Sequence, residues 1–306
     1  MNRKAPLLIL HGSDGEAAAS RSGYRVGGYS DVYKLLPPGL PVAQANLSRQ
    51  FAGTRPLPDP AGFERVLNLV TDPDQHPRTL ERVAKLLRGF AGRVINRPEA
   101  VMRTTRDLVA RRLAGIDGLQ VPRVLRLRNP RPGAASAAVE RAGHSFPLIV
   151  RLAGTHTGRI IGIVNGPAEL DAAAAGPGEF IITEFVDYRS PDGLYRKYRL
   201  WSFGQRAIFR HLLISDNWNV HVRERLRFMV ERPDLIAEEQ QALRRSEGDL
   251  PEPVHGVFAE VRGRLGLDFF GMDFGIGRDG RVILFEANAT MSFFPLVTHP
   301  RFQYLD

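Results

Sequence analysis

Residues 271–290 read GMDFGIGRDGRVILFEANAT, and this stretch decides the fold prediction. Two runs with β-strand character, 270–276 and 281–288, flank the dipeptide Asp279-Gly280. Asp-Gly between alternating apolar residues is among the strongest short-range signals for a two-residue hairpin turn. The stretch therefore predicts an antiparallel β-hairpin.

Three oxygen-bearing side chains are predicted to share one face of that hairpin. With a two-residue turn, Asp273 lies directly opposite Glu286, and Asn288 points to the same face because strand side chains alternate. Opposed carboxylates repel each other, and a hard cation such as Mg²⁺, which prefers oxygen ligands, removes that repulsion. A chance pair on a solvated strand is the alternative. A three-residue turn with a bulge could also break the shared face.

The composition is that of an ordinary soluble globular chain. Its 306 residues are 43% hydrophobic and 25% charged, which indicates two domains or one large one. The absence of cysteine excludes disulfides, thiolate catalysis and Cys-ligated zinc. The sequence has no secretory signal and no apolar stretch of roughly 20 residues. We therefore expect a cytoplasmic protein without membrane spans.

The net charge of +9 is carried almost wholly by arginine. A basic balance can indicate nucleic acid, an acidic substrate or the base composition of the genome. The arginines are scattered through every segment and do not form one basic tail. This distribution argues against a nucleic-acid partner.

Strand and helix patterns alternate over about the first 96 residues. Strands are predicted at 6–10, 41–47 and 65–70, and the spacing of apolar residues over 79–90 predicts a helix. Such alternation is typical of a small parallel α/β domain.

The remaining sequence mixes strands with helices. Strands are predicted at 146–151, 180–186 and 198–214. The residues 254–265 form one apolar face at helical spacing and predict an amphipathic helix. The stretch 126–145, rich in Ala, Arg, Gly and Pro, is predicted to be a loop or a hairpin tip. The polar stretch 231–253 is predicted to be a mobile excursion that could serve as a lid.

Basic residues at two strands are candidates for binding an anion. Arg151 ends an apolar strand and precedes a loop with Gly154 and Gly158, where backbone N–H groups could wrap phosphate oxygens. Alternation places Lys197 and Arg199 on one face of a later strand. Arginine suits a phosphate or an oxyanion because it keeps its charge and binds bidentately. An ordinary β-turn and a solvated basic face are the respective alternatives.

Taken together and in this order, these segments resemble the ATP-grasp superfamily, closest to its ribosomal-protein glutamate ligase and glutathione synthetase branch. The resemblance covers roughly residues 94–294 and is most specific at 271–291. It implies an α/β fold of the α+β ATP-grasp type. A small parallel α/β domain, 1–96, would be followed by two α+β subdomains, 97–186 and 187–306, that clasp ATP.

The resemblance implies a magnesium site and an adenine site. The two Mg²⁺ ions that bridge the triphosphate would be held by Asp273, Glu286 and Asn288. The run 184–187 resembles the hinge strand of the family. There, adenine would be bound by the chain at Glu184, Phe185 and Val186, and a ribose hydroxyl by Asp187.

The resemblance also implies roles for four arginines. Arg106 and Arg151 occupy places where family members usually carry ATP-binding lysines. Arg199 and Arg210 match basic residues that contact phosphate and the reacting carboxylate, and they are the expected catalytic residues. Arginine keeps the charge of lysine but has a different reach and a forked geometry. Either ATP binds with adjusted contacts, or catalysis is impaired.

The implied activity is that of an ATP-dependent carboxylate–amine ligase. It would form an amide or peptide bond through an acylphosphate and would release ADP and phosphate. ATP and Mg²⁺ are the implied cofactors, and the partners are a small-molecule or peptide carboxylate and an amine. A homodimer is one possible assembly. The alternative is an ATP-binding module or pseudoenzyme without ligase activity, which the two arginine replacements favour.

Overall fold

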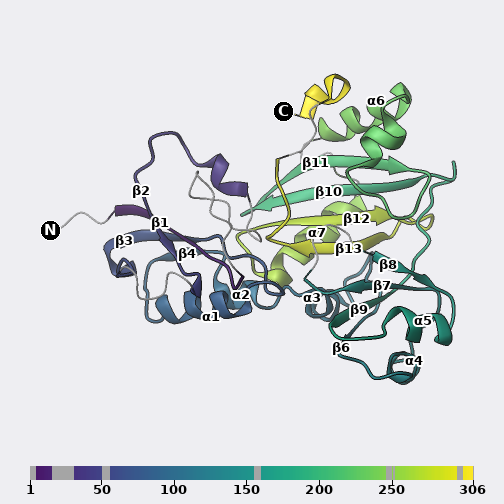
Figure 1. The fold of residues 1–306 in the computed structure, drawn as a ribbon. Helices are drawn as coiled ribbons and strands as arrows, with labels where there is room; N and C mark the ends of the chain where they lie inside the picture. Colours follow the sequence, from purple (N-terminus) through teal and green to yellow (C-terminus); the bar gives the residue numbers. More distant parts are fainter. Residues whose placement is uncertain are drawn as a thin grey trace.

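The computed structural model describes residues 5–15, 31–49, 56–154, 160–245, 250, 252–294 and 299–305. Its strands form three sheets (Figure 1). Short helical turns connect the larger elements; they are η1 (Asp31–Leu35), η3 (Pro60–Gly62), η4 (Arg225–Met229) and η6 (Pro300–Leu305). Within these ranges, no helix combines the length and the apolarity that crossing a bilayer requires.

The first sheet is parallel and has the strand order β2-β1-β3-β4. Its strands are β1 (Ala5–His11), β2 (Val42–Asn46), β3 (Phe63–Asn68) and β4 (Arg93–Ile95). The central strand β1 buries the continuous apolar run Leu7–Leu10, as expected for a parallel strand covered on both faces. Helices α1 (Pro77–Leu86) and α2 (Pro98–Val101) follow β3 and β4. The predicted parallel α/β arrangement of the N-terminal part is confirmed.

The second sheet is antiparallel and has the order β6-β9-β7-β8. Its strands are β6 (Val124–Arg128), β7 (Leu148–Leu152), β8 (Ile160–Val164) and β9 (Glu179–Glu184). Two helices cover the sheet, namely α4 (Ala134–Arg141) and α5 (Pro167–Ala173) (Figure 1). The prediction of a loop at 126–145 was wrong. It missed α4 because alanines and a single buried valine, Val139, provide its packing face.

The third sheet has the order β11-β10-β12-β13-β5, and its buried residues belong to the same large core as those of the first sheet. Its strands are β5 (Leu119–Gln120), β10 (Tyr195–Phe203), β11 (Arg206–Ser215), β12 (Phe269–Ile276) and β13 (Val282–Asn288). Helices α3 (Arg106–Leu113) and α7 (Glu252–Leu265) pack with it. Side chains alternate between the two faces of these strands. Met272, Phe274 and Leu284 are buried in the core, whereas Asp273, Ile283 and Phe285 point to the face toward the second sheet.

The hairpin of β12 and β13 has the predicted pairing, but its turn and its register differ from the prediction. The loop contains three residues, 278–280, and Gly280 adopts a left-handed backbone with φ 79°. A β-bulge between Asp273 and Phe274 then shifts the register by one residue. The two departures cancel, so that Asp273 pairs with Glu286 as predicted.

The segment 231–253 contains a packed helix, and the prediction of a mobile excursion was wrong for the part that the structure describes. Helix α6 (Pro233–Leu243) lies against β11 and buries Leu235 and Ile236 (Figure 1). A glutamate, Glu239, is also fully buried there, so polarity alone did not reveal the packed face. Residues 246–249 and 251 lie outside the described part.

The boundaries at 96/97 and 186/187 stay a prediction. One feature crosses them: the short strand β5 pairs with β13 of the third sheet, although it precedes the second sheet in sequence. Helix α3 likewise contacts both β6 and β13. The segment 97–120 is therefore shared between the second and third sheets.

Candidate active site

A cleft lies between the second and third sheets and consists of two adjoining lobes. The α3 lobe has a volume of about 780 Å³ and extends along α3 to the segment 72–74. The aromatic lobe has a volume of about 1050 Å³ and contains Phe185, Tyr188 and Trp218. The lobes share the lining residues Arg106, Pro122, Arg151, Thr183, Leu284, Phe285 and Glu286.

A row of polar side chains crosses the third sheet at the base of this cleft. The strand register aligns His211 of β11, Arg199 of β10, Asp273 of β12 and Glu286 of β13. Lys197 lies two residues before Arg199 and points to the same face. Sheet register thus brings together residues from four strands that are far apart in the sequence.

Asp273 is buried and binds two cations. Arg199 donates from Nε to Oδ1 at 2.5 Å and from Nη2 to Oδ2 at 2.8 Å, and Lys197 Nζ lies 3.5 Å from Oδ2. Burial alone would raise the pKa of Asp273, but the charges of Arg199 and Lys197 outweigh it and hold that pKa far below the usual range. Burial and the charge of Arg199 lower the pKa of His211, so its ring is neutral at neutral pH.

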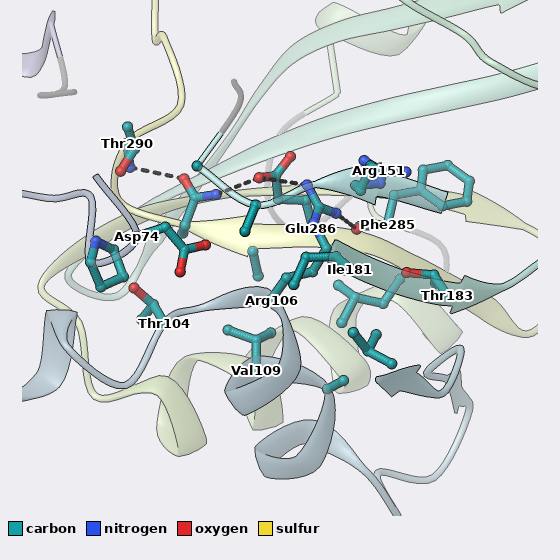
Figure 2. Close-up of a pocket in the computed structure, with 18 of the residues that line it drawn as sticks. Asp74, Thr104, Arg106, Val109, Arg151, Ile181, Thr183, Phe285, Glu286 and Thr290 are labelled. Atoms are coloured by element: carbon teal, nitrogen blue, oxygen red, sulfur yellow. Dashed lines mark hydrogen bonds and ion pairs between the residues drawn. The ribbon is translucent and has the colours of Figure 1, made fainter. Parts of the chain in front are cut away.

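Glu286 binds the guanidinium of Arg106, which reaches it from α3 (Figure 2). The distance between Arg106 Nη2 and Glu286 Oε1 is 3.0 Å, and Arg106 Nη1 donates to the carbonyl oxygen of Phe285 at 2.6 Å. Asn288 Nδ2 also donates to Glu286 Oε1, at 2.8 Å. Asn288 Oδ1 accepts from the backbone N–H groups of Thr290 and Met291. A cation at Asn288 would therefore compete with these two hydrogen bonds.

Arg151, at the end of β7, lines both lobes (Figure 2). Burial and the nearby charge of Arg106 lower its pKa to about 9. Its Nε is buried and has no hydrogen-bond partner among the described residues, and the same holds for Thr183 Oγ1. Buried polar groups are normally satisfied, so these two atoms indicate a polar or anionic ligand in the cleft.

The predicted hinge run lies at the aromatic lobe, with one exception. Glu184, Phe185 and Val186 line the lobe, where the ring of Phe185 meets that of Trp218 edge-on at 5.6 Å. The N–H groups of Glu184 and Phe185 are already bonded to backbone carbonyls. Asp187 lines neither lobe; it is exposed and binds Arg189.

The remaining predicted site residues fall in different places. Gly154 lines the α3 lobe, and Gly158 lies outside the described residues. Arg210 lines neither lobe, because it is the extra residue of a β-bulge in β11. Its Nε donates to the carbonyl oxygen of Phe293 at 2.8 Å, and its guanidinium lies over the Phe293 ring.

The prediction did not include Thr183, Asp74 or Thr104 among the site residues, although all three line the cleft. Thr183 was recoverable from the alternation of β9, since it faces the same way as Ile181. Asp74 belongs to the N-terminal part and binds Arg126 of β6 at 2.7 Å. No pattern in the sequence places Asp74 and Arg126 together.

The donor chemistry fits a hard divalent cation. Asp273, Glu286 and Asn288 offer only carboxylate and amide oxygens to the cleft, which is the set that Mg²⁺ prefers. Within the described ranges, no group of three or more His, Cys, Asp or Glu side chains could hold a metal on its own. A three-ligand site here therefore depends on the amide of Asn288.

Solved structures with the same fold include several ATP-grasp ligases. The chain is similar to the VanG D-Ala:D-Ser ligase from Enterococcus faecalis, with a TM-score of 0.56, 12% identity and coverage of 97% of this chain and 94% of that one. For the ATP-grasp ligase PsnB, complexed with a minimal precursor, Mg and ADP, the TM-score is 0.53 and the identity is 15%, with coverage of 94% of this chain and 90% of that one. For the D-alanine–D-alanine ligase from Bacillus anthracis, complexed with ATP, the TM-score is 0.50 and the identity is 11%, with coverage of 94% of this chain and 86% of that one.

At the level of sequence, no family model and no curated protein matches the chain. The similarity to these structures concerns the fold. The chain has the fold of the ATP-grasp ligases, and the resemblance that the sequence indicated is confirmed at that level.

Proposed function

We propose that the protein is an ATP-dependent ligase that joins a carboxylate to an amine. The observation that carries this proposal is the surplus of positive charge around Asp273 and Glu286. Arg106, Arg151, Lys197 and Arg199 face the two carboxylates of Asp273 and Glu286. Buried charge without a partner is costly, so a polyanion such as a nucleoside triphosphate fits this site better than a neutral ligand.

The two lobes suit the two ends of ATP. Adenine would lie in the aromatic lobe, which Val186, Tyr188 and Trp218 line. The triphosphate would extend toward Arg151 and Arg106, where the unpaired Nε of Arg151 can donate to a phosphate oxygen. Gly154 lines the α3 lobe beside them. The roles of Glu184, Asp187 and Gly158 stay predictions.

The face shared by Asp273, Glu286 and Asn288 would hold Mg²⁺. When bound, Mg²⁺ neutralises phosphate charge and polarises the γ-phosphoryl group. Among the neighbours, PsnB was solved with Mg and ADP. The side chains themselves orient the site: Arg106 holds the carboxylate of Glu286, and the Asx turn of Asn288 fixes the chain that follows β13.

The reaction that these groups would support has two steps. An oxygen of the substrate carboxylate attacks the γ-phosphorus of ATP, and the bond to the β-phosphate oxygen breaks, which gives an acylphosphate and ADP. The amine nitrogen then attacks the acyl carbon and loses a proton, and phosphate leaves. Arg199 lies at the base of the cleft, where it can neutralise the approaching anions. The predicted contact of Arg210 with the reacting carboxylate stays a prediction, since Arg210 lines neither lobe.

The substrates are proposed to be a small-molecule or peptide carboxylate and an amine. VanG is named for D-Ala and D-Ser, and PsnB was solved with a precursor peptide, so both substrate sizes occur with this fold. The cytoplasmic location and the homodimer expected from the sequence stay predictions.

A screen for ADP release tests the proposal. The protein is incubated with ATP, Mg²⁺ and pairs of amino acids or short peptides, and product masses are measured. We expect ADP together with a product whose mass equals the joined substrates less water. Arg151→Met should lose this turnover, whereas the exposed control Arg128→Met, on the same sheet, should retain it. ATP binding without ADP from any pair would identify a binding module instead.

A further inference from the structure

The charged residues of the α3 lobe lie at its two ends. Arg106, Arg151 and Glu286 line the part that this lobe shares with the aromatic lobe, whereas Asp72 and Asp74 line only the α3 lobe. The carboxylate of Asp74 points into the pocket, and the two arginines lie farther along it (Figure 2). The end of the lobe at segment 72–74 is therefore acidic, in contrast to the end with the arginines.

Asp74 presents one carboxylate oxygen to this acidic end. Its Oδ1 accepts from Arg126 Nη2 at 2.7 Å, and Arg126 does not line the lobe. Its Oδ2 has no hydrogen-bond donor among the residues that the structure describes. The Oδ1 atom of Asp72, in contrast, accepts from the backbone N–H groups of Asp74 and Gln75. The oxygen that is open to a ligand is therefore Asp74 Oδ2.

Arg126 compensates the charge of Asp74 only in part. The same guanidinium also binds Asp107 and Glu179, each at 2.9 Å, so three carboxylates share one cation. Asp107 and Glu179 each have a further arginine partner, whereas in the described part of the chain Asp74 has Arg126 alone. Burial raises the pKa of Asp74, and the charge of Arg126 does not cancel that rise. A cationic ligand at Oδ2 would supply the missing compensation.

Apolar side chains line much of the remaining α3 lobe. They include Val109 and Ala110 of α3, and Val124 at the start of β6. A pocket of this kind holds the apolar body of a ligand, and a few polar groups fix its orientation. The lobe therefore suits a ligand that combines an apolar body with one cationic group.

We propose that the α3 lobe binds the amine substrate in its ammonium form and that Asp74 recognises the ammonium group. The substrate class is a primary amine with an apolar side chain, for example an amino-acid amide or the N-terminus of a peptide. This inference rests on the proposed function and adds to it a substrate class and a specificity residue. The amine would lie in the same lobe as the phosphate end of ATP, where the acylphosphate forms.

Matched cationic and neutral probes test the inference without any turnover. The full-length protein is saturated with a non-hydrolysable ATP analogue and Mg²⁺ at neutral pH. It is then titrated in a calorimeter with the amides of alanine, valine, leucine and phenylalanine, and with the 2-hydroxy analogues in which a hydroxyl replaces the ammonium group. We expect at least one amide to bind about tenfold more tightly than its hydroxy analogue. A wild-type protein that prefers none of the four amides would overturn the inference.

Two variants that each remove a carboxylate partner of Arg126 separate recognition from structure. Asp74→Asn should reduce the preference for the amide to less than about threefold. The matched control is Glu179→Gln. Glu179 binds the same guanidinium but lines neither lobe, so the preference should persist. Equal preferences in the two variants would show that Asp74 does not recognise the amine.

A third variant, Ala110→Leu, covers the case in which Asp74→Asn does not fold. It leaves Asp74 and Arg126 intact and places a larger side chain in the α3 lobe but not in the aromatic lobe. The affinity for the preferred amide should fall about tenfold, and that for the ATP analogue should change by less than about threefold. An unchanged amide affinity would place the amine elsewhere and overturn the inference, while the proposed ligase stands. Failure of the wild-type protein to bind the analogue would overturn the proposed function itself.

Discussion

Two arginine–carboxylate pairs can be compared: Arg225–Glu239, on helical elements that pack against β11, and Arg199–Asp273, which lines the cleft. Arg225 and Glu239 are 1% and 0% exposed and meet at 2.5 Å between η4 and α6. The other oxygen contacts of Glu239 come from neutral donors, the backbone N–H of Leu212 and the hydroxyl of Tyr304. One cation therefore faces one anion, and the pair needs nothing from outside the protein.

The pair of Arg199 and Asp273 is not balanced in this way. Lys197 adds a second cation at Asp273, and Arg106 and Arg151 add two more around Glu286. Around Asp273 and Glu286 the cationic side chains therefore outnumber the two carboxylates. The proposed ligand site is therefore distinguished from the Arg225–Glu239 pair by its surplus of one charge and not by the presence of an ion pair.

Removing the structural anion should have the largest effect on stability. Glu239→Gln leaves the charge of Arg225 buried without a partner, and we expect a loss of about 3–5 kcal/mol in the free energy of unfolding. Urea denaturation measures it. Glu238→Gln, one residue earlier on α6, breaks only a partly exposed pair with Arg196 and should cost about 1 kcal/mol or less. Equal losses in the two variants would contradict the comparison.

Removing a surplus cation should weaken ATP binding and leave the stability of the fold unchanged. Arg151→Met should raise the dissociation constant of ATP roughly 10- to 100-fold, because a charge-assisted hydrogen bond contributes about 1.5–3 kcal/mol. The unliganded variant should be no less stable than the wild type, since the buried Nε of Arg151 has no partner among the described residues. Calorimetric titration and thermal unfolding check the two parts. A destabilised protein with unchanged ATP affinity would show that Arg151 is structural.

The smallest effect concerns pH. The pKa of Arg151 is lowered to about 9, so between that pH and the higher pKa of an exposed arginine the unfolded chain binds more protons than the folded one. The contribution of Arg151 to stability therefore rises as pH increases above about 9. ATP affinity should fall over the same range, because binding requires the charged form. The depressed pKa of Lys197 acts in the same direction.

The matched measurement for this prediction uses Arg151→Met. The difference between wild type and variant isolates Arg151 from Lys197 and from other groups that titrate at high pH. Unfolding and ATP affinity are followed for both proteins from about pH 8 to about pH 10.5. A wild-type affinity that falls no more steeply than that of the variant would exclude Arg151 from the nucleotide site.

Local patterns were sufficient for much of the fold. The apolar runs of β1, β7 and β9, the helix α7 and the hairpin β12–β13 all follow from periodicity and turn residues. Helices α4 and α6 did not follow, because alanine and a buried glutamate provide part of their packed faces. These two helices are packed because of the elements around them, and their own apolar residues do not reveal it.

The site was predictable to the extent that it depends on strand alternation. Alternation alone places Glu286 with Asn288 and Lys197 with Arg199 on shared faces, whereas the pairing of Asp273 with Glu286 also depends on the turn and on a bulge. It did not predict that Asp187 would turn to Arg189, or that a bulge would direct Arg210 toward Phe293. Asp187 follows the end of β9, and Arg210 lies at a bulge within β11; at such irregular backbone a one-residue shift changes the direction of a side chain.

The sequence by itself determined which side chains share a strand face, because a period of two is a local property of the backbone. It determined the oxygen-bearing face of the hairpin and the basic face of β10. Only the tertiary structure decided that these faces lie side by side on one sheet, with Arg199 beside Asp273, and that Arg106 reaches Glu286 from α3. Such pairings join residues that are far apart along the chain. Sheet order and helix packing bring them together, and neither is contained in any single segment.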